Sequence, residues 1–334
     1  MRIDPEFASA GRFFEESPVY KVHIYQRGYA WEKDEINDFL KDLELVYNAR
    51  KEGNPKNHFL GSIVTIQEKF AGVVGKHSYE LVDGQQRMPT FVLLASAIYE
   101  MTKEIVATCH EGGDITNQKI AERRAEKIYN RFIEFEQEIN RVVNIQPVLT
   151  LSKTDNPFFS SLIRGNILDT TRDSHIRLKN AIIEIKKRVK ILTFDADINV
   201  FLDNLEILIQ NIDGDFSLLR IITYDRKEAY TLFQVLNDRG RSLTEGDLLR
   251  AKTLEMLDAF PFQQQQVEGF WDDILKDKTA LTENYLHWIY ASFQGKRAGK
   301  STLFDDLLSV FYPENTAPSR RCFPFGLGII SKTK

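Results

Sequence analysis

The sequence has few cysteines and histidines, no excess of positive charge and no long hydrophobic run. Its two cysteines, Cys109 and Cys322, form neither a CxxC pair nor a disulfide framework. The six histidines are scattered and lack the spacing of zinc ligands. With a formal net charge of −4, the chain has no global field that attracts nucleic acid, so any DNA contact has to come from local basic patches.

The hydrophobic runs are too short to cross a bilayer, and no signal peptide is visible at the N-terminus. We therefore expect a cytoplasmic protein with no membrane partner. Hydrophobic residues make up 43% of the chain and charged residues 28%, which is typical of a globular protein. A length of 334 residues allows two domains, each with its own core.

The most informative stretch is YELVDGQQRMPT at residues 79–90. Residues 79–82 have the composition of a short buried strand, and Asp83-Gly84 is a strong turn dipeptide. Pro89 suits the first turn of a helix, where its missing N–H would have no partner. The sequence therefore predicts a strand, a tight turn and a helix, and the helix is apolar at helical spacing at Phe91, Leu94, Ala95 and Ile98.

This turn carries four polar side chains at the start of the predicted helix. A helix N-terminus has free N–H groups and a partial positive charge, which suit a phosphate. Arg87 can bind phosphate oxygens with two N–H groups, and the amides of Gln85 and Gln86 can orient phosphate or water. Asp83 could accept a proton or hold a metal ion. From spacing alone, a solvated turn whose Asp83 caps the helix is an equally good interpretation.

DGQQR at residues 83–87 resembles the signature of a large prokaryotic family first catalogued as domain of unknown function 262. Three other segments agree with the family in the expected order: YQRGYAW at 25–31, FLGSIV at 59–64, and a distal motif at 233–249 that begins FQVLNDRG and ends DLL. The family includes the N-terminal part of GmrSD-type modification-dependent restriction enzymes and related phage-defence proteins. Each motif is weak alone, but the four together are a strong signal.

The resemblance implies a ParB/sulfiredoxin-like fold, so we expect an α+β protein. Residues 1–11, which begin MRIDPEF, are expected to be a disordered, vector-derived leader. Residues 12–100 are expected to form the small, mixed ParB-like domain with the DGQQR motif. A mostly α-helical domain with the distal motif would follow at 101–312, and 313–334 would be an irregular tail.

The resemblance also implies a component of a prokaryotic DNA restriction or phage-defence system. Such a component would bind and hydrolyse a nucleoside triphosphate (NTP) with Mg²⁺, and would couple the nucleotide to recognition or cleavage of DNA, including modified DNA. Under this hypothesis Asp83 also holds the metal. The implied catalytic residues are Asp83, Gln85, Gln86 and Arg87, and the implied nucleotide-binding residues are Tyr25, Gln26, Arg27, Gly84, Thr90, Asn237, Arg239 and Gly240.

Two features depart from the family. The signature commonly continues Leu-Thr-Thr, whereas this chain has Met88-Pro89-Thr90, and Pro89 removes one backbone donor from the proposed phosphate cradle. Larger members carry a C-terminal HNH-type nuclease domain, and no such motif occurs in this sequence. Besides NTP and DNA, the expected partners are thus a nuclease subunit, or a nuclease domain that this sequence lacks, and a second copy of the chain.

Two alternatives to the NTPase stay open. One is a non-catalytic module that senses nucleotide or DNA and switches its assembly with a nuclease, which the Met88-Pro89 departure favours. The other is direct nicking of DNA by the ParB-like domain, against which the acidic net charge and the lack of a metal cluster count.

Several other residues have both a structural and a functional interpretation. Tyr29 and Trp31 could form walls of a binding site, although core packing is the commoner role of tryptophan. Asp247 could be a ligand or could interact with a helix dipole. Residues 116–143 predict one long charged helix with a basic cluster at Arg123, Arg124, Lys127 and Arg131. Trp271 and Trp288 are expected to be packing residues.

Overall fold

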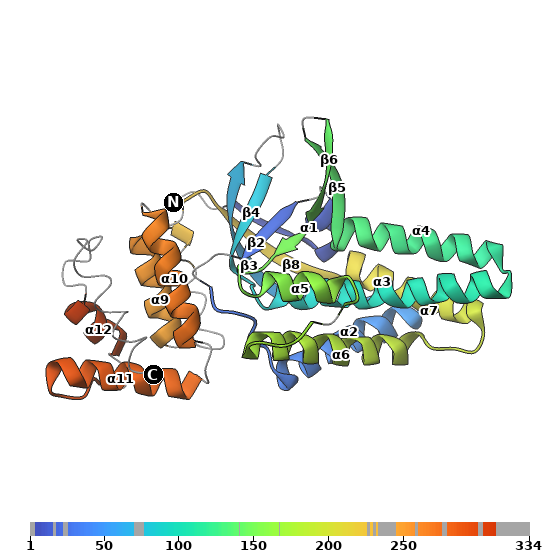
Figure 1. The fold of residues 1–334 in the computed structure, drawn as a ribbon. Coiled ribbons are helices and arrows are strands. Elements are labelled where there is room, and N and C mark those ends of the chain that lie inside the picture. The colour runs from blue at the N-terminus through green and yellow to red at the C-terminus, as the bar shows by residue number, and fades with distance from the viewer. Residues whose placement is uncertain are drawn as a thin grey trace. The chain divides into compact units, whose positions relative to one another are not determined.

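The computed structural model describes residues 4–15, 18–22, 26–69, 77–139, 141–166, 168–225, 228–229, 232, 245–257, 260–275, 279–299 and 303–311. The chain forms two compact units. Unit 1 comprises residues 1–23 and 28–233, and unit 2 comprises residues 24–27 and 234–334. As the sequence predicts, the fold is α+β: four of the six strands of its main sheet lie before residue 84, and most of the helices follow them (Figure 1).

Unit 1 is built on a six-stranded mixed sheet with the strand order β1-β8-β3-β4-β2-β7. β3 lies at its centre, parallel to β8 and antiparallel to β4. β4 and β2 are parallel, as are β2 and β7, whereas β1 is antiparallel to β8. The strands are β1 (Asp4–Ser9), β2 (Val19–Val22), β3 (His58–Lys69), β4 (His77–Asp83), β7 (Leu149–Thr150) and β8 (Phe216–Thr223). β5 (Glu134–Ile139) and β6 (Val142–Pro147) form a separate antiparallel hairpin.

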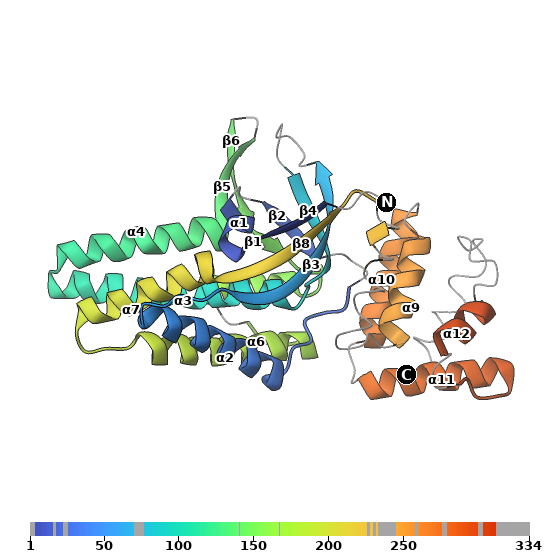
Figure 2. The same cartoon turned by 180° about the vertical axis from the view of Figure 1, so that it is seen from behind.

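The helix that follows the DGQQR turn is the central helix of unit 1. Every residue of α3 (Arg87–Gly112) from Met88 to Ile98 is buried. The reason is that α3 packs against α4 and α6 and also belongs to the hydrophobic core next to the sheet (Figure 2). A helix that is apolar on all sides is stable only when it is enclosed in this way. The other helices of unit 1 are α1 (Ala10–Glu15), α2 (Lys33–Lys51), α4 (Ile115–Phe132), α5 (Asn156–Ile163), α6 (Asp173–Thr193), α7 (Ile198–Gln210) and the π-helical turn η1 (Asn211–Asp215).

Aromatic packing holds the first turns of α3 in place. The ring of Phe91 stacks on Phe14 of α1 with centroids 5.6 Å apart, and it meets Phe132 of α4 edge-on at 5.9 Å. Each of the three rings is at most 2% exposed. Aromatic pairs at these separations add about 0.5–1.5 kcal/mol beyond the burial of their area. The N-terminus of α3, and the turn before it, are therefore attached to a rigid core.

The described helices of unit 2 have a core of their own. Trp271 is 2% exposed and donates its indole N–H to Thr253 Oγ1 at 2.7 Å, so its predicted packing role is confirmed. Trp288 is 63% exposed, so the same prediction is wrong for that residue. The described helices are α9 (Glu245–Met256), α10 (Pro261–Leu275), α11 (Thr279–Gln294) and α12 (Leu303–Phe311).

The structure differs from the expected organisation at three places. Residues 4–9, expected to be a disordered leader, form β1, because the edge of β8 offers them a full set of backbone partners. Unit 1 continues through the boundary expected at residue 100, since α3 crosses it and packs on later helices. The helix expected over 116–143 ends at Phe132, because residues 134–139 (EFEQEI) alternate with a strand period. The tail expected at 313–334 lies outside the described residues.

A search of the described helices for a stretch apolar and long enough to cross a bilayer found none.

Candidate functional site

The predicted strand, turn and helix are present at the DGQQR motif. β4 ends at Asp83, α3 begins at Arg87, and the Met88 N–H donates to the Gly84 carbonyl at 3.0 Å. Gly84 has φ +92°, and a Cβ there would lie 2.5 Å from Cγ2 of Ile63 on β3. Only glycine fits this backbone so close to the neighbouring strand. Gly84 therefore sets the tightness of the turn.

Arg87 lies against the backbone of β3. Its Nη1 donates to the Ser62 carbonyl at 2.6 Å and lies 3.7 Å from Oδ2 of Asp83. A Cβ on Gly61, which has φ +114°, would lie 3.1 Å from Nε of Arg87. The Arg87 side chain is 35% exposed and that of Asp83 18%. One edge of the guanidinium is thus fixed by the protein, and its charge remains accessible beside a carboxylate.

β3 is irregular where it meets Arg87. Its pairing with β8 shifts register between Phe59 and Gly61, and its pairing with β4 shifts between Val64 and Thr65. Bulges of this kind re-aim a strand, and they are frequent next to functional sites. From the sequence, FLGSIV is predicted only as a family motif, without a role in the site. A glycine inside an apolar strand is the signal that predicts such a close approach.

Gln85 has a buried acceptor. The residue is 8% exposed, and its Oε1 has no hydrogen-bond partner in the part of the chain that the structure describes. Leaving a buried polar atom unpaired costs about 1–3 kcal/mol. Oε1 of Gln85 can therefore accept a hydrogen bond from a ligand or water that binds at this turn, next to Asp83 and Arg87.

Gln86 differs from Gln85 because both ends of its amide are engaged. Oε1 accepts from the Ala30 N–H at 2.7 Å, and Nε2 donates to the Gly28 carbonyl at 3.3 Å. These bonds fix residues 28–30, the segment that directly follows Arg27 in the sequence. The geometry suits an anchor for this segment better than a ligand for phosphate or water.

Thr90 is fully buried and is part of the same anchorage. Its hydroxyl lies 2.7 Å from that of Tyr29, and it also donates to the Gln86 carbonyl at 2.8 Å. Tyr29 is 3% exposed, and burial raises the pKa of its phenol. Neither side chain presents a face to a ligand, so the interpretation of Tyr29 as a wall of a binding site is not supported.

Asp155 holds the same segment from α5. Its Oδ2 accepts from the Tyr29 N–H at 3.2 Å, and its Oδ1 accepts from the Ser174 hydroxyl at 2.6 Å. A Cβ on Gly28 would lie 2.8 Å from Oδ2 of Asp155, so glycine allows this close approach. Residues 28–30 are thus fixed from two directions, by Asp155 and by Gln86.

The candidates from the outer motifs lie in unit 2. Arg27 Nη1 is 3.5 Å from Oδ2 of Asp247, so the structure brings together two residues that the sequence singled out 220 positions apart. Gln26 is 4% exposed. Four predicted nucleotide-binding residues lie outside the described residues: Tyr25, Asn237, Arg239 and Gly240.

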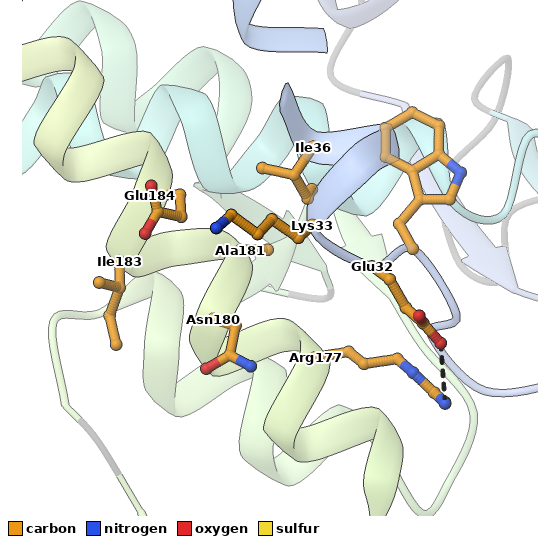
Figure 3. Close-up of a pocket in the computed structure, with 9 residues that line it drawn as sticks. Glu32, Lys33, Ile36, Arg177, Asn180, Ala181, Ile183 and Glu184 are labelled. Atoms are coloured by element: carbon orange, nitrogen blue, oxygen red, sulfur yellow. Dashed lines mark hydrogen bonds and ion pairs between the residues drawn. The ribbon is translucent and has the colours of Figure 1, made fainter. Parts of the chain in front are cut away.

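Trp31 lines a cavity of about 460 Å³ between the start of α2 and α6 (Figure 3). The lining combines apolar side chains with charges of both signs, and Arg177 pairs with Glu32 at 3.4 Å on one side. A cavity of this volume is within the usual range for small ligands. Trp31 is therefore partly a wall residue, although it also packs against Phe39 at 6.2 Å.

Three of the four residues of the basic cluster on α4 form ion pairs within unit 1. Arg124 pairs with Glu206 at 2.8 Å, and Asp213 pairs with both Lys127, at 3.3 Å, and Arg131, at 2.9 Å. These ion pairs connect α4 to α7 and η1. Because Asp213 is shared by two of these cations, two carboxylates offset only two of the three positive charges.

Within the described residues, no group of three or more His, Cys, Asp or Glu side chains could hold a metal ion. Asp83 is the acidic side chain of the turn. Mg²⁺ commonly binds through one or two carboxylates together with substrate phosphates. The donor set therefore suits an ion that arrives with a nucleotide and does not suit a resident metal.

A family model described as the GmrSD restriction endonuclease N-terminal domain matches residues 11–254, which include the turn, β3 and the Arg27–Asp247 pair. No curated protein matches the chain significantly.

Proposed function

Because this chain belongs to the family of GmrSD restriction endonuclease N-terminal domains, we propose that it is the NTP-binding and NTP-hydrolysing component of a restriction or phage-defence system. The observation that carries the proposal is the placement of Arg87. Its guanidinium is fixed on the β3 carbonyl of Ser62 and lies beside Asp83 at the N-terminus of a rigid helix. Transfer of a phosphoryl group depends mostly on positioning and on charge stabilisation, and these groups can provide both.

The roles follow from the contacts. The guanidinium N–H groups of Arg87 that do not contact Ser62 neutralise phosphate charge. The Asp83 carboxylate orients the attacking water or, together with phosphate oxygens, holds Mg²⁺. The ion, when bound, would neutralise phosphate charge. Gln85 uses its buried Oε1 to orient water. Gln86 and Thr90 are positioning residues, because their polar atoms hold residues 28–30 and Tyr29.

The test is release of phosphate from ATP, GTP, CTP and UTP with Mg²⁺, with and without DNA. Arg87→Ala and Asp83→Asn are each expected to lower turnover about 100-fold or more, as the loss of one transition-state donor commonly does. Arg188→Ala is the matched control, since it removes a guanidinium of similar exposure that pairs with Glu44 between α6 and α2. A melting temperature for each variant separates loss of function from loss of fold.

Turnover at the parental rate in Arg87→Ala would refute the catalytic role. Nucleotide binding without turnover, abolished by Arg87→Ala, would instead support the second candidate, a nucleotide-sensing module. The specific observation that favours this candidate is that Arg87 already has a protein carbonyl and a carboxylate as partners, while Pro89 removes a backbone donor from the helix start.

Coupling to DNA is part of the proposal, with a nuclease subunit or domain as the cutting partner. The logarithm of the DNA affinity should fall linearly with the logarithm of the salt concentration, and the slope is proportional to the number of phosphates contacted. A salt series with parental protein, with and without nucleotide, measures that number. Equal DNA affinity in both nucleotide states would show that the nucleotide does not control DNA binding. A nicking assay on supercoiled DNA tests the remaining alternative, direct nicking of DNA by this domain.

A further inference from the structure

β5 and β6 form a ribbon that extends from the end of α4, separate from the six-stranded sheet (Figure 1). Its base is fixed in unit 1, because the buried Glu134 carboxylate accepts from Tyr129 Oη at 2.5 Å and pairs with Arg164. Beyond the base, the ribbon has only two strands. Two strands alone are marginally stable in water, and three or more with a shared apolar face are usually needed.

The outer part of the ribbon exposes large apolar side chains. Val142, Val143 and Ile145 are 58%, 61% and 63% exposed. All three are on β6, and all are β-branched residues that suit strand pairing. Because side chains alternate along a strand, Val143 and Ile145 share one face of β6 and form an apolar patch of the kind that marks an interaction site, whereas Val142 lies on the other face.

The two edges of the ribbon differ in charge. β5 carries Glu136 and Glu138, both exposed, whereas β6 contains no charged residue from Val142 to Pro147. Charged side chains are the usual means by which proteins prevent an edge strand from pairing with another chain. The acidic strand also disfavours a nucleic-acid partner, because its carboxylates would repel phosphates. The uncharged outer edge of β6 is therefore suited to another protein strand.

We propose that β6 pairs antiparallel with β6 of a second copy of this chain, around a two-fold axis at Asn144. The pattern of the strand carries the choice of partner. Val143 and Ile145 lie symmetrically about Asn144, so this register places Val143 of each copy opposite Ile145 of the other. Asn144 meets Asn144. Apolar side chains then pair on one face, and amides pair on the other.

This register also gives the arrangement expected of an interface. Within the hairpin, Ile145 is paired with Glu136 and Val143 with Glu138. In each row across the joined four-stranded sheet, Ile145 of one copy and Val143 of the other therefore lie in the middle, and a carboxylate lies at each end. An apolar centre with a charged rim is the common composition of protein interfaces. Because one strand per copy buries a small area, we expect a weak dimer, with a dissociation constant of roughly 1–100 µM.

The test uses site-specific cross-linking of the full chain in a Cys322→Ser background, where the remaining Cys109 is buried. Asn144→Cys places two thiols directly opposite each other, within reach of a disulfide. We expect a disulfide-linked dimer on a non-reducing gel. Glu136→Cys on the opposite strand is the control, because in this register the two copies of residue 136 lie two strands from the axis. Cross-linking of both variants to the same extent would overturn the proposal.

Sedimentation velocity over a concentration series gives a second readout without cysteines. The parental chain should shift from monomer to dimer, and Ile145→Lys should abolish the shift because the lysine would lie in the apolar centre. The hairpin itself should persist in this variant, since the ammonium group faces Glu136 across the strands. A parental chain that stays monomeric up to roughly 100 µM overturns the proposal. The NTPase proposal is unaffected by either result.

Discussion

At the scale of single residues, the position of Arg87 depends on a glycine in the neighbouring strand. Gly61 has φ +114°, which is strained for any other residue, and a Cβ there would press on Nε of Arg87 at 3.1 Å. We expect Gly61→Ala to displace the guanidinium and to lower NTP turnover about 10-fold or more, since displacements near 1 Å can cost that much. Phosphate release at saturating nucleotide measures the effect.

Gly53→Ala is the matched control for this prediction. Gly53 also has a positive φ, of +77°, but a Cβ there meets nothing within 4 Å. The control therefore carries the backbone strain of a positive φ without the steric contact. Turnover that falls equally in both variants would show that general destabilisation, and not the position of Arg87, explains the loss.

His175 makes the stability of unit 1 depend on pH. It stacks on Phe158 with centroids 4.3 Å apart, and its Nε2 lies 3.2 Å from the Thr154 carbonyl. Burial lowers the pKa of His175 below 6.5, and Arg172 adds to that effect, whereas Thr154 and Asp155 oppose it. The unfolded chain therefore takes up this proton at a higher pH than the folded protein, and stability is lost as pH falls below about 6.5.

We expect His175→Gln to reduce this loss. The measurement is the urea midpoint of the parental chain and of the variant between about pH 8 and pH 5. The variant should start lower, because it loses the ring stack, but should change less with pH. An identical pH dependence in the two proteins would contradict the assignment to His175.

At the scale of elements, β1 is predicted to stabilise the sheet. It pairs with β8 over six residues, and Glu6 forms an ion pair with Arg220, whose side chain is 10% exposed. The guanidinium also lies over the rings of Phe13 and Tyr79, at 4.8 and 4.6 Å. A chain that starts at Ala10 should melt several degrees lower, because it loses the β8 partner and leaves a mostly buried charge without its carboxylate.

Glu6→Gln in the full chain separates the two contributions to this effect. It keeps the strand and removes the charge, so it should lower the free energy of unfolding by roughly 1–3 kcal/mol, less than the truncation does. Differential scanning fluorimetry of the three proteins measures the order. An unchanged melting temperature in the truncated chain would mean that residues 4–9 do not contribute to the fold.

At the scale of the whole molecule, the described residues form two separate hydrophobic cores. One lies in unit 1 and includes Leu43, and the other lies in unit 2 and includes Leu254; both side chains are fully buried. Cores that share no side chains are expected to unfold in separate transitions. Leu43→Ala and Leu254→Ala should each lower the free energy of unfolding of one unit by about 2–5 kcal/mol. In calorimetry, each variant should lower the midpoint of one transition and leave the other midpoint unchanged. A single transition shifted by either variant would show that the two units unfold together.

Both the local structure of the candidate site and the family could be predicted from the sequence. Asp83-Gly84 and Pro89 predict a turn and a helix start through the conformations that their own backbones allow. Four short motifs, in the order expected of the family, predict the family that the comparison found. Such local patterns are reliable because the conformations they predict depend on residues adjacent in the sequence. The same patterns failed at residues 134–139, where a strand period follows directly on a helical one.

Which polar groups of the turn remain available to a ligand depends on the tertiary structure. Gln85 and Gln86 are adjacent and chemically identical, yet Gln86 is occupied by Ala30, 56 residues away in sequence, while the Gln85 oxygen is buried without a partner among the described residues. Likewise Arg87 meets Ser62 and Thr90 meets Tyr29. A buried donor or acceptor is paired by whichever segment the fold brings to it, and no periodicity or turn preference in the sequence specifies that segment.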